Sequence, residues 1–369
     1  MKFRCDSANL INGLKTVISA LPARPANPVL DGILIETGGN LVSMTCSDER
    51  MTIVTTVSAD IVESGCGIVP GKLFNEVVKG LAGGDVEVAM NEKNGFTVRG
   101  SGSRTNIAGQ DADLYPELPK VKEEHAITIP QDMLKRMISK TAFAVAIEDM
   151  REVLTGAYLE FNGGNANMVG LDGYRLALCT AQTSSIDDTC SAIIPGKVIN
   201  DIGKMLSESP DAFAEMSIGG GKLHMKVDNT DVYAVLIEGD YINYKAIIPK
   251  SYTTKAGMSV KDFRDAVERA ALIAKQGANN LLVLKIAGGE MAIESRSEIG
   301  DVHETIDVLQ DGDDLNIAFN VKYLIDVLRN ITDDEIEMNF TGAVSPCTIV
   351  PAHENGVTYL VLPVRTGAV

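Results

Sequence analysis

The clearest pattern in the chain is a helix signature that returns at long intervals. Apolar residues stand at helical spacing behind Lys72, and the same arrangement follows Lys197 and Lys322. Both intervals, 197 − 72 and 322 − 197, are 125 residues, and the first two copies open with Pro-Gly-Lys. Because this period has the length of a domain, the pattern predicts three repeats of one fold.

Two predicted strands return with nearly the same period. Gly32 opens the apolar run GILIET, Gly156 opens GAYLEF 124 residues later, and Asn280 opens NLLVLKI after another 124. The strand that follows repeats too, because Asp48 and Asp172 are also 124 residues apart. Markers of two kinds in nearly one register favour triplication of a whole domain over a chance match of one helix.

Each predicted repeat begins with a helix whose apolar residues fall on one face, and Ser7 is the expected N-cap of the first. These opening helices are expected at residues 7–20, 131–146 and 259–275. The lysine-headed helices are expected at residues 72–82, 197–208 and 322–331. Strands precede and follow each lysine-headed helix. The chain is therefore expected to be α+β, with two helices packed on antiparallel sheets in each domain.

Two stretches that combine acidic, aromatic and proline residues separate the repeats. They span residues 111–124 and 239–257, and Pro119 and Pro249 close their apolar runs. Proline fixes the backbone and donates no hydrogen bond to a sheet, so we expect stiff connectors and a fixed arrangement of domains. The predicted domains are residues 1–122, 123–250 and 251–369.

Composition limits the class of protein. A chain of 369 residues exceeds one ordinary core, which agrees with three domains. No stretch reaches the roughly 18 apolar residues of a membrane span, and the first ten residues lack the apolar region of a signal peptide, so we expect a cytoplasmic protein. The six cysteines form no CxxC pair, which favours small buried residues in a reducing compartment over zinc ligands or disulfides.

Charge is distributed unevenly along the chain. The six predicted helices together carry a formal charge of +6, and the rest carries −23, which gives the net −17. One alternative is that Lys and Arg simply favour solvated helices. The lysine at the head of the same helix in all three repeats favours instead a basic layer that attracts phosphate on one side of an acidic body.

Domain size indicates what such a layer could enclose. A domain of about 120 residues is roughly 30 to 35 Å across. Three domains in a ring leave almost no hole, whereas six leave one of about 30 Å, wider than the roughly 20 Å of a DNA duplex. We therefore expect that one chain cannot encircle DNA and that a head-to-tail pair can.

Several motifs together resemble one family. They are YLVLPVR at residues 359–365, LDGYRLAL at residues 171–178, the two Pro-Gly-Lys helices, and an opening helix followed by Arg24-Pro25. In register over the whole chain, they resemble the bacterial sliding clamp, the β subunit of DNA polymerase III. The resemblance implies a homodimeric ring of six domains, with helices lining the hole and a continuous outer sheet. It implies no catalysis, metal or cofactor.

The resemblance also implies partners and sites. The ring would slide on double-stranded DNA and tether the DNA polymerase III alpha subunit, the clamp loader, and other replication and repair proteins. The peptide groove would comprise Leu154, Leu171, Gly173, Tyr174, Arg175, Leu176, Ile242, Ile247, Val344, Pro346, Leu360, Leu362, Pro363, Val364 and Arg365. DNA contacts would come from Arg24, Lys72, Lys79, Lys135, Arg136, Arg151, Lys197, Lys204, Lys275 and Lys322. The dimer joint would set Phe74, Val77 and Ile107 against Leu272 and Ile273.

One loop departs from the family pattern. Glu148 and Glu152-Val153 flank Arg151, where the family carries Gln and paired Tyr residues. The three Gly-Lys pairs lack the preceding Gly and following Ser or Thr of a nucleotide-binding loop. Two other functions remain open: an enzyme built from repeats, and a peptide-binding adaptor that never meets DNA. The lack of a convergent His, Cys or carboxylate constellation favours a scaffold over the enzyme.

Overall fold

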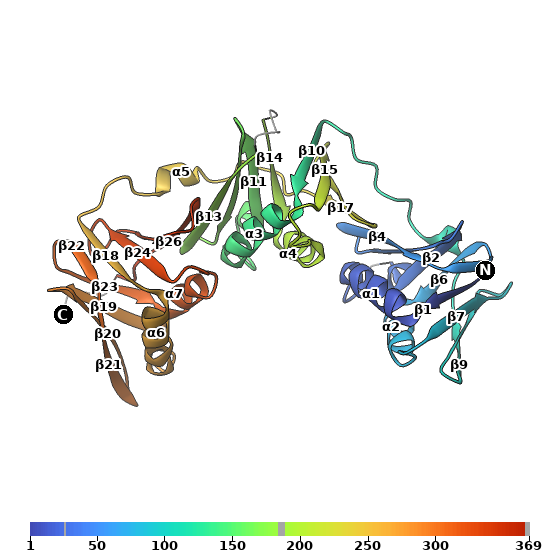
Figure 1. Ribbon diagram of the computed structural model, residues 1–369, viewed down its shortest axis with the longest axis horizontal. Helices are drawn as coiled ribbons and strands as arrows, with labels where there is room; N and C mark the ends of the chain where they lie inside the picture. Colours follow the sequence, from blue (N-terminus) through green and yellow to red (C-terminus); the bar gives the residue numbers. More distant parts are fainter. Residues whose placement is uncertain (26, 184–188, 366–369) are drawn as a thin grey trace. The chain divides into compact units, whose positions relative to one another are not determined.

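The computed structural model describes residues 1–25, 27–183 and 189–365. The chain forms two compact units. The first unit contains Met1–Asp132 and Asp201–Leu236, and the second contains Met133–Asn200 and the chain from Ile237 onward. The elements follow one another in the same order three times along the chain (Figure 1). The predicted triplication and the α+β class are therefore confirmed.

Each repeat contains two antiparallel sets of four strands, here called set A and set B. Set A comes from the middle of the repeat, and its spatial order is β6-β2-β3-β4, β14-β11-β12-β13 or β23-β19-β20-β21. In the first repeat its strands are β2 (Gly32–Gly38), β3 (Leu41–Ser47), β4 (Met51–Ser58) and β6 (Gly65–Pro70). In the second they are β11 (Gly156–Asn162), β12 (Asn165–Leu171), β13 (Arg175–Gln182) and β14 (Cys190–Pro195). In the third they are β19 (Leu281–Ala287), β20 (Glu290–Ser297), β21 (Gly300–Asp307) and β23 (Leu315–Asn320).

Set B combines the first strand of the repeat with its last three, in the order β1-β7-β8-β9, β10-β15-β16-β17 or β18-β24-β25-β26. The first copy is β1 (Lys2–Asp6), β7 (Asp85–Met90), β8 (Gly95–Gly100) and β9 (Ser103–Ala108). The second is β10 (His125–Pro130), β15 (Phe213–Gly219), β16 (Lys222–Val227) and β17 (Thr230–Val235). The third is β18 (Thr254–Ser259), β24 (Glu335–Phe340), β25 (Cys347–Pro351) and β26 (Val357–Val361). Edge strands β5 (Asp60–Glu63) and β22 (Leu309–Gly312) flank β1 and β18.

All six predicted helices are present, with two corrections. The opening helices are α1 (Ser7–Val17), α3 (Gln131–Thr141) and α6 (Val260–Ala274). The lysine-headed helices are α2 (Gly71–Lys79), α4 (Gly196–Met205) and α7 (Val321–Leu328). Each repeat begins with a strand, β1, β10 or β18, rather than with the helix. The N-cap of α1 is Asp6, whose carboxylate accepts from the N–H groups of Ala8 and Asn9 at 3.0 and 3.1 Å, while Ser7 is buried.

The opening helix of the first repeat shows how the helices attach to the sheet. α1 buries Leu10 and Leu14 on one face, and each such side chain contributes about 2 kcal/mol relative to an exposed one. Gly13 lies on that face, and a Cβ atom there would come within 2.7 Å of Cγ1 of the β-branched Val57 in β4. Glycine therefore permits the close approach of helix to sheet. α1 lies beside α2, as α6 lies beside α7 (Figure 1).

The sheets continue from one repeat into the next. In the first unit, β4 pairs with β17, so that Thr55 lies opposite Thr230. In the second unit, β13 pairs with β26, so that Arg175 lies opposite Val361. The expected continuous sheet is confirmed at these two joints. Within the described residues, β9 and β21 each have a neighbouring strand on one side only.

Candidate functional site

An apolar cluster forms where the middle and last repeats meet, entirely within the second unit. Its fully buried members are Leu154, Val169, Leu171, Leu176, Tyr244 and Leu360. The half-buried members that pack against it include Ile242, Ile247 and Leu362. Seven of the fifteen predicted groove residues therefore belong to one cluster, although they come from four separate stretches of chain.

Strand pairing explains why these residues converge. Leu176 lies directly opposite Leu360 in the β13–β26 ladder, and side chains alternate between faces along a strand. Just beyond the ladder, the Leu362 N–H donates to the Tyr174 carbonyl at 2.9 Å. Gly173 has φ 86°, a conformation that glycine adopts without strain, so the β12–β13 turn can present Tyr174 beside the cluster.

Other predicted groove residues lie outside the cluster and differ in exposure. Tyr174 is 59% exposed and Val344 is 67% exposed, which are high values for large apolar side chains. Pro346, Pro363 and Val364 are half-buried, and Arg365 is exposed. An exposed apolar rim beside a buried apolar floor is typical of a surface that binds a partner.

Aromatic residues of the linker also hold this region and were missed from the sequence. Tyr241 stacks on Tyr158 with ring centroids 4.8 Å apart, and the Tyr244 hydroxyl donates to Glu160 at 2.9 Å. Lys245 bonds the same carboxylate at 3.0 Å. Burial by itself raises the pKa of Glu160, but the bonds from Lys245 and Tyr244 outweigh it and hold this pKa below its ordinary value. The short helix α5 (Tyr244–Ile247) is thereby fixed on β11.

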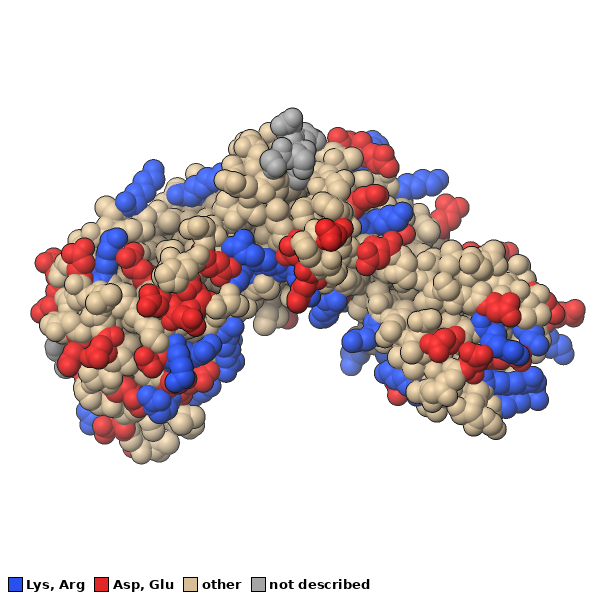
Figure 2. All heavy atoms as spheres, in the orientation of Figure 1, with Lys and Arg blue, Asp and Glu red and all other residues tan. Residues whose placement is uncertain are grey.

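Most of the predicted DNA-contacting cations lie at the surface. The exposed ones are Arg24, Lys72, Lys79, Arg151, Lys197, Lys204, Lys275 and Lys322. Some have acidic neighbours: Lys79 bonds Glu76 at 3.1 Å, and Arg151 bonds Asp149 at 3.2 Å. Figure 2 shows acidic and basic side chains interspersed over the visible face. The basic layer on one side of the protein remains a prediction.

Lys135 and Arg136 of α3 are only half-exposed. Arg136 donates from Nε to Glu354 at 3.0 Å and from Nη2 to the Asn355 carbonyl at 2.9 Å. Lys140, which is 4% exposed, donates to the other oxygen of Glu354 at 2.8 Å. Arg136 and Lys140 therefore join α3 to the β25–β26 turn. Sequence reasoning missed this role.

We expect Glu354→Gln to lower the free energy of unfolding by about 3 kcal/mol, because the buried side chain of Lys140 would lose its carboxylate partner. Urea unfolding at pH 7 measures this loss. The exposed pair Lys255–Glu337 supplies the control, and Glu337→Gln should change the free energy by less than about 0.5 kcal/mol. Equal losses in the two variants would contradict the assignment.

The same carboxylate predicts a pH dependence. Burial by itself raises the pKa of Glu354, but bonds from Lys140 and Arg136 hold it below its ordinary 4.5. The unfolded chain then binds the proton more readily than the folded chain. This contribution to stability is complete above pH 4.5 and declines as the pH falls through the lower folded pKa. Wild type should therefore lose more stability than Glu354→Gln between pH 6 and about pH 3.5 in urea titrations.

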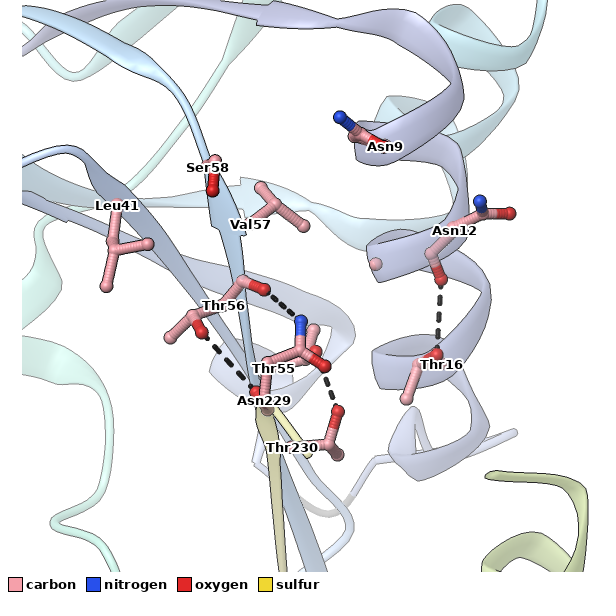
Figure 3. A pocket seen from close by; sticks show the side chains of 11 residues that line it. Asn9, Asn12, Thr16, Leu41, Thr55, Thr56, Val57, Ser58, Asn229 and Thr230 are labelled. Atoms are coloured by element: carbon pink, nitrogen blue, oxygen red, sulfur yellow. Dashed lines mark hydrogen bonds between the residues drawn. The ribbon is translucent and has the colours of Figure 1, made fainter. Parts of the chain in front are cut away.

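The first joint differs from the second at the corresponding place. Asn12 and Thr16 of α1 stand 124 residues before Arg136 and Lys140, at 136 − 12 and 140 − 16. There the structure has an open cavity of about 350 Å³, lined also by Asn229 and neighbouring residues (Figure 3). Short neutral side chains thus leave space where the second joint has two long cations. The side chains that line it are neutral amides, hydroxyls and small apolar groups.

The predicted dimer residues differ in accessibility. Phe74 and Ile107 are buried within their own domain, at 0% and 4% exposure. Val77 and Ile273 are half-buried, and Leu272 is 69% exposed. Among neighbouring apolar residues, Leu73 and Ile299 are also exposed, at 51% and 74%. Helix spacing alone did not distinguish the exposed Leu73 from the buried Phe74.

No group of three His, Cys, Asp or Glu side chains within the described residues could hold a metal ion. None of the helices in the described ranges is long and apolar enough to cross a bilayer.

Comparison with known proteins covers almost the entire chain. Residues 1–119, 128–243 and 245–365 match the N-terminal, central and C-terminal domains of the DNA polymerase III beta subunit. The beta sliding clamps of Staphylococcus epidermidis and Staphylococcus aureus are each 32% identical over 378 residues, covering 99% of this chain and 100% of theirs. The Bacillus subtilis sliding clamp superposes with a TM-score of 0.94 at 31% identity, covering 100% of both chains. A Pseudomonas aeruginosa clamp bound to griselimycin gives 0.94 at 25% identity, covering 99% of this chain and 100% of its own.

Proposed function

The chain belongs to the family of the DNA polymerase III beta subunit, the sliding clamps, and from this premise we propose that two copies close head to tail around duplex DNA. As a member of that family it is a non-catalytic processivity factor of DNA polymerase. Several strands have one neighbour only among the described residues, and two of them, β9 and β21, correspond by repeat to the strands that pair at the joints within the chain. This correspondence is the observation that carries the proposed ring.

The repeat supplies the pairing rule for these edges. At both joints in the chain, the last strand of set A, β4 or β13, pairs with the last strand of set B in the next repeat, β17 or β26. In the third repeat the last strand of set A is β21, and in the first repeat the last strand of set B is β9. We therefore pair β21 of one copy with β9 of the other, and two such joints close a two-fold ring.

The same rule predicts a register. Thr55 lies opposite Thr230, and Cys179, 124 residues after Thr55, lies opposite Val357. Thr230, Val357 and Ser103 each begin the corresponding strand. Another step of 124 residues leads to His303, so Ser103 of one copy should lie opposite His303 of its partner or the residue beside it.

We expect Leu272→Glu to convert the dimer to monomer, because a carboxylate would be buried at the joint without a partner. Leu272 is 69% exposed in the single chain, so the substitution should leave the fold intact. Sedimentation velocity measures the assembly state. Leu114→Glu, at an apolar residue that is 57% exposed in the linker of the first domain, is the matched control and should remain dimeric. A Leu272→Glu dimer of undiminished affinity would refute this joint.

In this joint Phe74 and Ile107 act from inside their domain, by packing beneath the edge, while Leu73, Leu272 and Ile273 offer apolar surface. The proposed boundaries of the three domains stay at residues 122 and 250. The proposed location is the cytoplasm, where a DNA polymerase subunit meets its template.

The exposed cations on the inner helices are proposed to face the DNA. Contacts to phosphate position a protein without reading sequence, which suits a ring that must slide. Arg151 contributes least in this proposal, because Asp149 bonds it and Glu148 and Glu152 lie beside it. The weak, salt-dependent attraction of such contacts leaves topology as the main source of retention.

The apolar cluster and its rim are proposed to bind short peptides of the polymerase III alpha subunit, the clamp loader and other partners. The support is the combination of buried Leu176 and Leu360 with exposed Tyr174 and Val344. When a peptide docks a few apolar side chains on a preformed surface, the protein has little to order, so the free-energy cost of binding is small. Different partners can therefore use one site in turn.

A further inference from the structure

Arg175 occupies an unusual place in the proposed peptide site. It is the first residue of β13 and is only 8% exposed. The next residue, Leu176, belongs to the apolar cluster, and successive side chains along a strand point to opposite faces. The guanidinium of Arg175 therefore lies on the face of the sheet opposite Leu176.

The guanidinium is held by three separate parts of the chain. Its Nε donates to Asp172 at 3.0 Å in the β12–β13 turn, and Nη1 donates to Asp326 of α7 at 2.5 Å. Its Nη2 donates to the Phe143 carbonyl, just beyond α3, at 2.8 Å. Each nitrogen thus has a protein partner, and two of those partners are carboxylates, which form the stronger class of hydrogen bond.

Aromatic rings complete this arrangement. The guanidinium carbon lies 5.3 Å from the Phe143 ring centroid and 5.2 Å from that of Tyr323, within the range of cation–π attraction. Tyr323 also stacks on Tyr174, with centroids 5.5 Å apart and planes inclined by 12°. The exposed rim residue Tyr174 therefore rests on α7 through Tyr323.

These contacts connect α7 to the rim of the apolar cluster. Asp172 accepts from the N–H groups of Tyr174 and Arg175 at 2.9 Å, which shapes the turn. The carbonyl of Tyr174 accepts from the N–H of Leu362, a half-buried member of the cluster. Displacing the guanidinium would remove the link between α7 and this turn, and with it part of the support for Tyr174 and Leu362.

We propose that Arg175 is a positioning residue of the peptide site, which clasps α7 to the β12–β13 turn and holds the rim in its binding geometry without contacting the peptide. The inference rests on the proposed peptide-binding function and assigns Asp326 and Tyr323 to the same device. Preorganisation of this kind raises affinity because the protein has less to order on binding. It also requires a planar fork, which lysine lacks.

Asp326→Asn separates positioning from direct contact, because Asp326 bonds Arg175 but lies outside the apolar cluster. The assay is fluorescence anisotropy of a labelled polymerase-derived peptide with the intact protein. We expect Arg175→Gln to weaken binding about tenfold, the size of a lost charge-assisted bond, and Asp326→Asn to weaken it at least threefold. The double variant should bind no more weakly than Arg175→Gln, since both disrupt one device. Arg175→Lys should bind the peptide almost as weakly as Arg175→Gln does, because lysine lacks the planar fork.

Asp262→Asn, on the exposed face of α6, is the matched control and should bind as wild type does. Unchanged affinity of Asp326→Asn beside a weakened Arg175→Gln would overturn the proposal in favour of direct contact. Reduced thermal stability of both variants with wild-type affinity would overturn it in favour of a purely structural role. Failure of wild type to bind the peptide would instead refute the proposed function of the cluster.

Discussion

Rings of this protein loaded on a nicked circular duplex are expected to stay bound through a high-salt wash, whereas rings on a linear duplex of the same sequence are lost. Salt weakens contacts to phosphate, with affinity falling by roughly 10³ or more for proteins that rely on several of them. A closed ring on a circle has no end from which to leave. Loading requires a clamp loader and ATP, and retention is measured by gel filtration of labelled protein with the DNA.

The design contains its own controls. Linearising the loaded circle with a restriction enzyme should release the protein. The cut gives the DNA free ends but leaves the contacts between protein and DNA unchanged. Leu272→Glu, which is expected to break the joint, should give no retention on either DNA. Equal retention of the wild-type protein on circular and linear DNA would contradict encirclement and would indicate that direct contacts alone hold the protein on DNA.

Deleting residues 362–365 is expected to abolish binding of polymerase-derived peptides, and Leu362→Asp is expected to weaken it by at least about 100-fold. Leu362 packs against the apolar cluster, and a carboxylate there would have to be desolvated against an apolar peptide at a cost of several kcal/mol. Each 1.4 kcal/mol corresponds to a factor of about ten in affinity. Anisotropy with the labelled peptide measures the effect.

The point substitution guards against loss of fold, since the Val364 N–H donates to Ala318 in β23 and the deletion removes that bond as well. Sedimentation should show both variants as dimers. Leu114→Asp introduces the same charge at an exposed residue of the first domain and should bind peptide normally. Binding by Leu362→Asp within a few fold of wild type would place the peptide elsewhere.

Local periodicity predicted the elements well where one face of a helix is buried. All six predicted helices begin within one residue of the predicted starts, because apolar residues three and four apart must share a face. β1 was missed even though Lys2, Phe3, Arg4 and Cys5 alternate charged and apolar. A short strand is stabilised mainly by pairing with strands distant in sequence, here β5 and β7. The local sequence alone therefore predicts such a strand poorly.

The candidate site was predicted in part, and the misses share one cause. The family resemblance placed Leu176 and Leu360 in the groove, whereas Tyr244 and Tyr323 were not named for it. Tyr323 directly follows Lys322 in the sequence, and its ring stacks on Tyr174, 149 residues earlier at 323 − 174. The resemblance implied a DNA contact for Arg136, which stays a prediction, while its bond to Glu354, 218 residues away, was not foreseen.

The amino-acid sequence by itself determined the number of repeats, the kind of each main element, and which stretches are apolar enough to form cores. It did so because burial imposes the helix and strand periods on neighbouring residues, whatever lies across the interface. Only the tertiary structure decided which strand edges pair, which cations neutralise Glu354, and that Arg175 joins α7 to the turn beside Tyr174. Those outcomes depend on contacts between segments that are distant in sequence. Hydrophobic periodicity is a local property, so it does not predict which distant residue a side chain will contact.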